Sequence, residues 1–313
     1  MQEFRFIDLF AGIGGFRIAG EANGGKCVFT SEIDKFARRT YRAYFGKDHP
    51  IHGDIREIAA EDIPEHDMLF GGFPCQPFSV AAYRNRYRAD VSIAVAGFDD
   101  PRGNLFFEIA RILEHHKPKM FLLENVPSFM FHDNNRTCAT VMNILNGLGY
   151  YTVIDVVTSL GFVPQHRKRC FIAGFLEPNW FNFHLERPNH VKSKLCLHKP
   201  PVDPKWLVTK YLWERVVRYE HISPHWRVNP EKPVGALVCD YPSSMNTKFV
   251  QYEPDTHPRM LTTREYSRFM GFDSLRGNDY PITQSRTQSF AQFGNAVVPP
   301  LVTAIVKKML HYA

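Results

Sequence analysis

The first half of the chain alternates short apolar runs with longer segments whose apolar residues recur at helical spacing. The apolar runs lie at 4–10, 27–31, 68–72, 120–123, 150–157 and 170–175, and the helical segments begin at Phe16, 34, 104 and 136. Strands that alternate with helices pack as a parallel sheet covered by helices on both faces. The sequence therefore predicts an α/β fold with a doubly wound, mostly parallel sheet.

The alternation stops after Pro178. From there to about Pro258 the chain is rich in proline, histidine and aromatic residues, and it holds all four tryptophans. Helical spacing returns at 263–270, 286–293 and 299–310. We therefore predict a large domain made of residues 1–177 and 259–313, and a second, smaller, irregular domain at 178–258.

Composition limits the class of protein. The 313 residues are 44% hydrophobic and 22% charged, as in an ordinary globular protein. No apolar run approaches the ~20 residues of a membrane span, and the N-terminus lacks the pattern of a secretory signal, so we expect no membrane association. The six cysteines are scattered without a CxxC pair, which disfavours disulfides and a metal site and favours a reducing cytoplasm. The net charge of +6 weakly favours a polyanionic partner.

A glycine-rich turn, FAGIGGF at residues 10–16, stands between the first predicted strand and the first helix. Glycines let the backbone turn tightly and approach a ligand closely. Glu32 follows Gly12 by twenty positions, where an acid can accept hydrogen bonds from a ribose. Arg17 stands where a dinucleotide fingerprint has its third glycine, which favours a nucleoside cofactor without phosphates. Asp54 is expected to end a third strand and to receive an adenine amino group.

A thiol and a carboxylate follow two of the predicted strands. Pro74-Cys75-Gln76 comes after the run at 68–72, and Glu124 follows the run at 120–123. Parallel strands place both groups at one rim of the sheet, where ligands bind. A nucleophilic sulfur beside a proton-handling acid suits covalent catalysis.

Two basic segments accompany these groups. Alternation along a strand would put Arg167 and Arg169 on one face. The long segment 76–101 carries basic residues at 84–88 and is either a solvated insertion or a lid that closes over a polyanion.

Six motifs occur in a fixed order: FAGIGGF, PCQ, ENV, QxRxR, RxLTxRExxRxxGF (259–272) and FGNAVVP (293–299). Together they resemble the DNA (cytosine-5) methyltransferase family of the bacterial restriction-modification type. The resemblance covers nearly the whole chain, apart from about 178–258. It implies a Rossmann-like methyltransferase fold with a target-recognition domain at 178–258.

The resemblance also implies a cofactor and roles for particular residues. The cofactor would be S-adenosyl-L-methionine, with S-adenosyl-L-homocysteine as product and no metal. Its pocket would be lined by Phe10, Gly12, Gly14, Glu32, Ile33, Asp54, Ile55, Pro74, Leu105 and Asn295. Ile33 stands where some relatives place an aromatic residue against the adenine. Cys75 would be the nucleophile, Glu124 would engage cytosine N3, and Arg169 with Arg167 would contact O2.

The implied partner is double-stranded DNA, from which the target cytosine would be flipped out of the helix. We also expect a monomer in the cytoplasm at the nucleoid, functionally linked to a restriction endonuclease without a stable complex. Candidate base readers in the variable region are Arg187, Lys192, Arg227, Ser243, Ser244 and Asn246.

Three alternatives stay open. A tRNA-methylating branch of the family shares the motifs, and a non-catalytic nucleic-acid-binding relative would keep the fold. A nicotinamide oxidoreductase is disfavoured by the glycine pattern.

Overall fold

The computed structural model describes residues 3–73, 105–187, 192–200, 202–218, 226–241, 248–251, 257–273 and 280–312. Pro74, Cys75 and the segment 76–101 lie outside these ranges, as do Ser243, Ser244 and Asn246.

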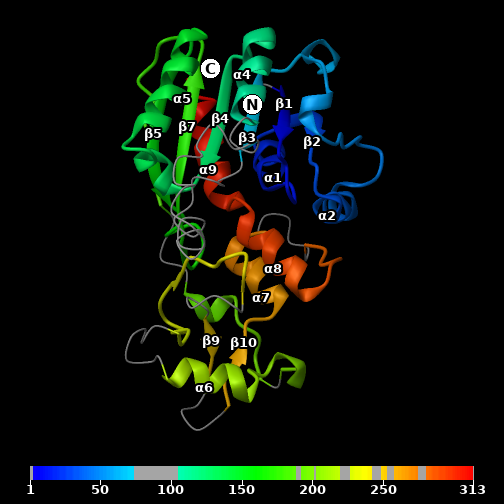
Figure 1. The fold of residues 1–313 in the computed structure, drawn as a ribbon, viewed down its shortest axis with the longest axis vertical. Coiled ribbons are helices and arrows are strands. Elements are labelled where there is room, and N and C mark those ends of the chain that lie inside the picture. The colour runs from blue at the N-terminus through cyan, green and yellow to red at the C-terminus, as the bar shows by residue number, and fades with distance from the viewer. Residues whose placement is uncertain are drawn as a thin grey trace, which may run out of the picture.

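A six-stranded sheet forms the centre of the upper part of the molecule in Figure 1. Its strands are β1 (Phe4–Leu9), β2 (Gly25–Ser31), β3 (Met68–Gly72), β4 (Met120–Asn125), β5 (Tyr151–Thr158) and β7 (Lys168–Phe175), in the order β2-β1-β3-β4-β7-β5. The pairs β1–β2, β1–β3 and β3–β4 are parallel, and β7 runs antiparallel to both β4 and β5. The predicted mostly parallel, doubly wound sheet is confirmed.

Helices cover both faces of this sheet. On one face α1 (Gly15–Ala22) and α9 (Pro299–Met309) pack over a cluster that includes Phe6 and Phe70. On the other, α4 (Leu105–His116) and α5 (Arg136–Gly147) pack over Leu69 and Phe121. Successive strand residues point to opposite faces, so burial on both sides explains why the strands read as continuous apolar runs. Helix α2 (Lys35–Phe45) lies next to β2 (Figure 1).

The second half of the chain adds short elements below the sheet in Figure 1. These are β6 (Gln165–His166) paired with β8 (Val234–Gly235), β9 (Phe249–Val250) paired with β10 (Arg259–Met260), and helices α6 (Lys210–Arg218), α7 (Thr263–Met270) and α8 (Arg286–Asn295). Short 3-10 helices occur in both halves of the chain. They are η1 (Ile55–Glu57), η2 (Ala60–Asp62), η4 (Pro127–Phe131), η5 (Ser193–Leu195) and η6 (Pro204–Trp206).

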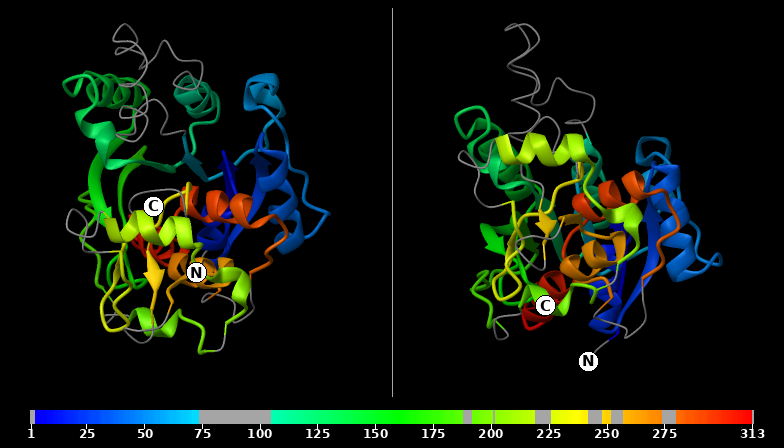
Figure 2. Two further views of the ribbon diagram at one scale, coloured as in Figure 1. Left: turned by 60° about the horizontal axis from the view of Figure 1, so that its bottom comes forward. Right: turned by 90° about the horizontal axis from the view of Figure 1, so that it is seen from below.

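One hydrophobic cluster runs from the sheet into these elements. Trp206, Trp226 and Phe249 belong to the same buried cluster as Phe70. In both views of Figure 2 the orange helices α7 and α8 lie beside the green and yellow described segments between residues 192 and 251. The predicted division at 258/259 falls between the paired strands β9 and β10, and we keep the two-domain division as a proposal.

Two local predictions were wrong in detail. Phe10 does not extend the first strand, because β1 ends at Leu9 and Phe10 has a positive φ of 55°. Asp54 does not end a strand; it caps η1 by accepting a hydrogen bond from the Arg56 N–H at 3.1 Å. An aspartate side chain that bonds a nearby backbone N–H favours such caps over strands.

One stretch of the described residues, Arg286–Met309, is long and apolar enough to cross a membrane. It consists of two helices, α8 and α9, and 67% of its most apolar window is buried inside the protein. Its apolarity is therefore that of a core segment.

Asp8 is a carboxyl group buried in the centre of the fold. It lies in β1 with no exposed surface, and neither carboxyl oxygen has a hydrogen bond among the described residues. Burial raises the pKa of Asp8 to about 8, while the charge of Arg17 acts in the opposite direction. The folded protein therefore binds a proton at Asp8 that the unfolded chain releases near pH 4.

We expect Asp8→Asn to be more stable than the wild type at pH 8. The pKa of Asp8 is raised on folding. Its contribution to the stability of the folded protein is therefore fully present below the pKa of the unfolded chain and is lost as the pH rises through the pKa of the folded protein. The free energy of unfolding should fall, relative to the variant, by about 1.4 kcal/mol per pH unit between pH 4 and 8. Urea titrations at several pH values measure the free energy of unfolding of both proteins. The same pH dependence of this free energy in the wild type and in Asp8→Asn would contradict the prediction.

Candidate active site

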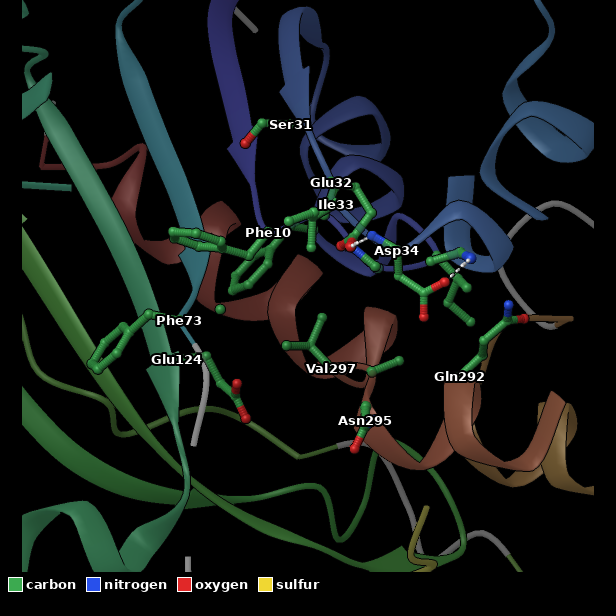
Figure 3. Close-up of a pocket in the computed structure, with 18 of the residues that line it drawn as sticks. Phe10, Ser31, Glu32, Ile33, Asp34, Phe73, Glu124, Gln292, Asn295 and Val297 are labelled. Atoms are coloured by element: carbon green, nitrogen blue, oxygen red, sulfur yellow. Dashed lines mark hydrogen bonds between the residues drawn. The ribbon is translucent and has the colours of Figure 1, made fainter. Parts of the chain in front are cut away.

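A cavity of about 410 Å³ opens at the carboxyl ends of the parallel strands. Its walls come from parts of the chain that lie far apart in the sequence: residues 10–13 and 15–16, 31–34 with Ala37, 53–56, 72–73, Leu105, Glu124 with Val126, and Arg169. The remaining wall is the C-terminal segment from Gln288 to Val297. Figure 3 shows Glu124 and Asn295 on one side of this cavity, with Glu32 and Asp34 across from them. The cavity thus lies at the rim of the sheet where open α/β folds bind their ligands.

The glycine-rich turn is fixed to the end of β2 by Glu32. One carboxylate oxygen of Glu32 accepts from the Gly12 N–H at 2.7 Å, and the other accepts from the Asp34 N–H at 2.7 Å. Gly12 has a positive φ of 55°, which only glycine adopts readily. Burial raises the pKa of Glu32, and the two N–H groups counteract this effect. Glu32 therefore links two turns and still has lone pairs for a ligand.

Gly14 does not line the cavity. It starts α1 in a left-handed conformation, with φ of 83°, and a Cβ there would come within 2.3 Å of the Phe45 ring. Its requirement for glycine is therefore one of backbone conformation and packing. The other described residues predicted for the pocket, Phe10, Gly12, Glu32, Ile33, Asp54, Ile55, Leu105 and Asn295, all line it.

Asp54 is held by its neighbour Arg56. The Arg56 Nε lies 2.9 and 3.0 Å from the two carboxylate oxygens, and this hydrogen bonding lowers the pKa of Asp54. The carboxylate therefore stays ionised and able to accept a hydrogen bond. Ile33 forms an apolar part of the same wall and is 67% exposed, so a flat ring could pack against it.

Glu124 and Arg169 form an ion pair on the cavity wall. Glu124 lies near the end of β4 opposite Gly72 of β3, and its Oε1 is 2.9 Å from the Arg169 Nε. Glu124 is only 9% exposed. Burial raises its pKa, while the charges of Arg169 and Arg167 act to lower it. A carboxyl group in this state can supply a proton or a hydrogen bond to a bound base.

Arg167 occupies a different place from Arg169. It does not belong to the cavity wall, and its guanidinium donates to the backbone carbonyls of Leu237, Gly294 and Ala296. The two arginines are two positions apart in sequence, but only Arg169 reaches Glu124 among the described residues.

The C-terminal wall contains residues that the motif alone did not reveal. Gln288, Ala291, Gln292 and Asn295 lie on one side of α8 and face the cavity. Gln292 also accepts a hydrogen bond from the Thr40 hydroxyl at 3.0 Å, which ties α8 to α2. Helical spacing counted back from Asn295 would have identified this face.

The cavity suits a nucleoside better than a phosphate ester. Its walls combine apolar side chains with the Glu32 and Asp54 carboxylates. Both arginines among its described lining residues are already paired, Arg56 with Asp54 and Arg169 with Glu124. A ligand phosphate would therefore find no unpaired guanidinium there, whereas ribose hydroxyls and a purine ring would be accommodated.

Comparison with known proteins agrees with this geometry. The profile of the C-5 cytosine-specific DNA methylase family matches residues 4–311. The chain is 38% identical to the Type II methyltransferase M.DsaV of Dactylococcopsis salina over 99% of this chain and 87% of the relative. It is 39% identical to the Type II methyltransferase M1.ScrFI of Lactococcus lactis subsp. cremoris, over 99% of this chain and 78% of the relative.

Solved structures share the fold at lower identity. The Dnmt2 methyltransferase of S. pombe superposes with a TM-score of 0.75 at 20% identity and 99% coverage of both chains. The methyltransferase EhMeth of Entamoeba histolytica gives 0.76 at 17% identity, covering 100% of this chain and 99% of that one. These neighbours confirm the Rossmann-like methyltransferase architecture. With the family profile spanning almost every residue, the chain belongs to the C-5 cytosine-specific DNA methylase family of methyltransferases.

Proposed function

We propose that this protein transfers a methyl group from S-adenosyl-L-methionine to C5 of a cytosine flipped out of a specific duplex DNA sequence. The observation that carries the proposal is that Glu124 and Arg169 share one cavity with Gly12 and Glu32. A base-binding pair and a nucleoside-binding turn thus open into the same space. The similarity to Type II methyltransferases supports DNA as the acceptor.

The cofactor would be held between the wall across the cavity from Glu124 and the end of α8. Glu32 would accept from the ribose hydroxyls, Asp54 from the adenine amino group, and Phe10 and Ile33 would pack on the ring. Asn295 would close the pocket from α8. When bound, S-adenosyl-L-methionine supplies an electrophilic methyl group. Pro74, which the resemblance places in this pocket, lies outside the described residues.

The target base would be bound on the other side. Glu124, with its pKa raised by burial, would donate to cytosine N3, and Arg169 would donate to O2. Both contacts stabilise negative charge that develops on the ring. Phe73 lines the cavity, and Cys75 follows it by two residues, outside the described part of the chain.

The proposed chemistry is a covalent addition and elimination. The Cys75 thiolate bonds to cytosine C6, and the electron pair of the C5–C6 bond becomes available at C5. C5 would then take the methyl group that a bound S-adenosyl-L-methionine supplies, with S-adenosyl-L-homocysteine as the leaving group. A base removes the C5 proton, and the C6–sulfur bond breaks to regenerate the thiolate and release 5-methylcytosine.

The recognition part is proposed to be the irregular domain at 178–258. Of its candidate base readers, Arg187 and Arg227 are exposed, and Arg227 lies 4.9 Å over the Trp226 ring. Lys192 pairs with Glu231 at 2.7 Å. We further propose that the protein is a monomer and acts in the cytoplasm at the nucleoid. It would be functionally linked to a restriction endonuclease without forming a stable complex with it.

The acceptor can be tested directly. Labelled S-adenosyl-L-methionine should donate its methyl group to mixed-sequence duplex DNA and not to tRNA. Transfer to tRNA alone would move the proposal to the RNA-methylating branch, and transfer to neither would leave a non-catalytic relative.

A substitution at Glu32 tests the cofactor site. Glu32→Gln keeps the shape but replaces one acceptor oxygen by an NH₂ donor that faces a backbone N–H or a ribose hydroxyl. We expect the variant to bind S-adenosyl-L-homocysteine about 10- to 100-fold more weakly, because a hydrogen bond to a charged group is lost. Isothermal titration calorimetry measures this affinity without DNA. Wild-type affinity in the variant would place the cofactor elsewhere.

A further inference from the structure

Leu237 is bound at both of its backbone groups by side chains that precede β7. The Gln165 side-chain oxygen accepts from the Leu237 N–H at 2.9 Å, and the Arg167 Nη1 donates to the Leu237 carbonyl at 2.9 Å. Gln165 and Arg167 are buried, with exposures of 0% and 2%. The segment 226–241 is therefore fixed at one residue to the chain that leads to Arg169.

The other half of the Arg167 guanidinium holds the cavity wall. Its Nη2 donates to the Gly294 carbonyl at 2.6 Å and to the Ala296 carbonyl at 3.1 Å. These carbonyls flank Asn295, which lines the cavity. A single side chain thus joins the segment at Leu237 to the backbone on both sides of a cofactor-pocket residue.

Gly294 allows this junction to form. A Cβ at this position would lie 2.5 Å from the Cys239 nitrogen and 2.6 Å from its Cα. The backbone of α8 therefore touches the backbone that follows Leu237. Gln165 adds a further tie, because its amide nitrogen donates to the Phe269 carbonyl in α7 at 3.0 Å.

The charge of Arg167 argues for a defined role. Among the described residues its guanidinium hydrogen-bonds only backbone carbonyls, and burial with the nearby charge of Arg169 lowers its pKa to about 9. Burying a cation without a carboxylate partner is costly unless its hydrogen bonds are well made. A forked, planar group can bond two segments at once, whereas the single ammonium of lysine cannot reproduce this geometry.

We propose that Gln165 and Arg167 are positioning residues that form a clamp on Leu237, and that Arg167 extends this clamp to the Asn295 wall. This inference rests on the proposed function and assigns Arg167 a role other than the base contact implied by the family resemblance. The clamp fixes the positions of the segment 226–241 and of the cofactor pocket relative to Arg169 and Glu124. Arg167 therefore acts on cofactor binding before any DNA is present.

Substitutions of the two clamp residues should weaken binding in different ways. Arg167→Lys breaks the ties to Leu237, Gly294 and Ala296, so both cofactor binding and DNA binding should weaken. Gln165→Met breaks the hydrogen bonds to Leu237, to the Phe269 carbonyl and to the Met270 sulfur, and leaves the bonds around Asn295 intact. It should weaken DNA binding and leave cofactor binding unchanged.

The experiment measures two affinities for each full-length variant. Calorimetry with S-adenosyl-L-homocysteine alone should show about 10- to 100-fold weaker binding for Arg167→Lys and wild-type binding for Gln165→Met. Titration of duplex DNA without cofactor should show weaker binding for both variants. Hydrogen exchange should rise at 234–241 in both variants, and at 290–297 only in Arg167→Lys.

The outcomes separate the clamp from a base contact. If Arg167→Lys binds the cofactor like the wild type and loses only DNA-dependent activity, Arg167 contacts the base and the clamp is wrong. If Arg167→Lys does not fold, Gln165→Met alone decides. Wild-type DNA affinity and wild-type hydrogen exchange at 234–241 would overturn the clamp, whereas weaker DNA binding with faster exchange would support it. Failure of the wild type to bind S-adenosyl-L-homocysteine would instead refute the proposed function.

Discussion

Cys75→Ser is expected to reduce methyl transfer to duplex DNA by about 10³-fold or more. A cysteine thiol ionises near pH 8.5, so a useful fraction of thiolate exists at neutral pH, whereas a serine hydroxyl stays protonated. Without addition at C6, the ring carbon C5 is too electron-poor to take the methyl group. Filter-binding measurement of labelled methyl groups in DNA gives the rate.

The cofactor site provides the control for this variant. The glycine turn, Glu32 and Asp54 come from other segments of the chain than Cys75, and the substitution leaves them unchanged, so we expect Cys75→Ser to bind S-adenosyl-L-homocysteine with the wild-type affinity. A serine variant with the wild-type rate would refute the role of the sulfur. Loss of both activity and cofactor binding would indicate a folding defect, and Cys75→Ala would then be tested in its place.

Glu124→Gln is expected to lower the single-turnover rate by about 10²- to 10⁴-fold. The amide has nearly the same shape but cannot transfer a proton to cytosine N3. It also replaces the carboxyl partner of Arg169, whose Nε is 2.9 Å away, by a neutral amide that cannot ionise when the proton has been transferred. The loss should therefore exceed that of an ordinary hydrogen bond.

The pH dependence gives a second signature of Glu124. Burial raises its pKa, so the protonated form persists to higher pH than for an exposed glutamate and is lost as the pH increases further. The wild-type rate should fall on the alkaline side as this proton leaves, and Glu124→Gln should lack that step. Rapid-quench rates across pH 5 to 9 measure both profiles, since about four pH units cover the range of a shifted carboxyl. Identical profiles would mean that another group controls the reaction.

The sequence predicted the sheet well because its strands are buried on both faces. The run at Met68–Gly72 was assigned its observed bounds, since apolar residues fill every position from Met68 to Phe70 and glycines end it. The strand at Phe4–Leu9 was placed one residue too long. Hydrophobicity does not distinguish Phe10, which continues the apolar pattern but has the left-handed backbone of the turn.

The predicted pocket agreed best where residues follow neighbouring strands of the sheet. Gly12 lies in the turn after β1 and Glu32 directly follows β2, and these two strands pair in parallel, so their proximity follows from the strand order. Arg167 shows the limit of such reasoning. Its partners, Leu237 and the two carbonyls around Asn295, come from segments whose packing no local pattern specifies.

We propose that a methyl donor and an extruded cytosine meet in one cavity, between Glu32 and Glu124. The most direct measurement uses duplex DNA that carries 5-fluorocytosine, in which the C5 fluorine cannot leave as a proton does. With this DNA and S-adenosyl-L-methionine, the protein should form a stable covalent adduct. Peptide mass mapping should then show one methylated base attached to Cys75. Absence of an adduct under conditions where the cofactor binds, or attachment at another residue, would contradict the account.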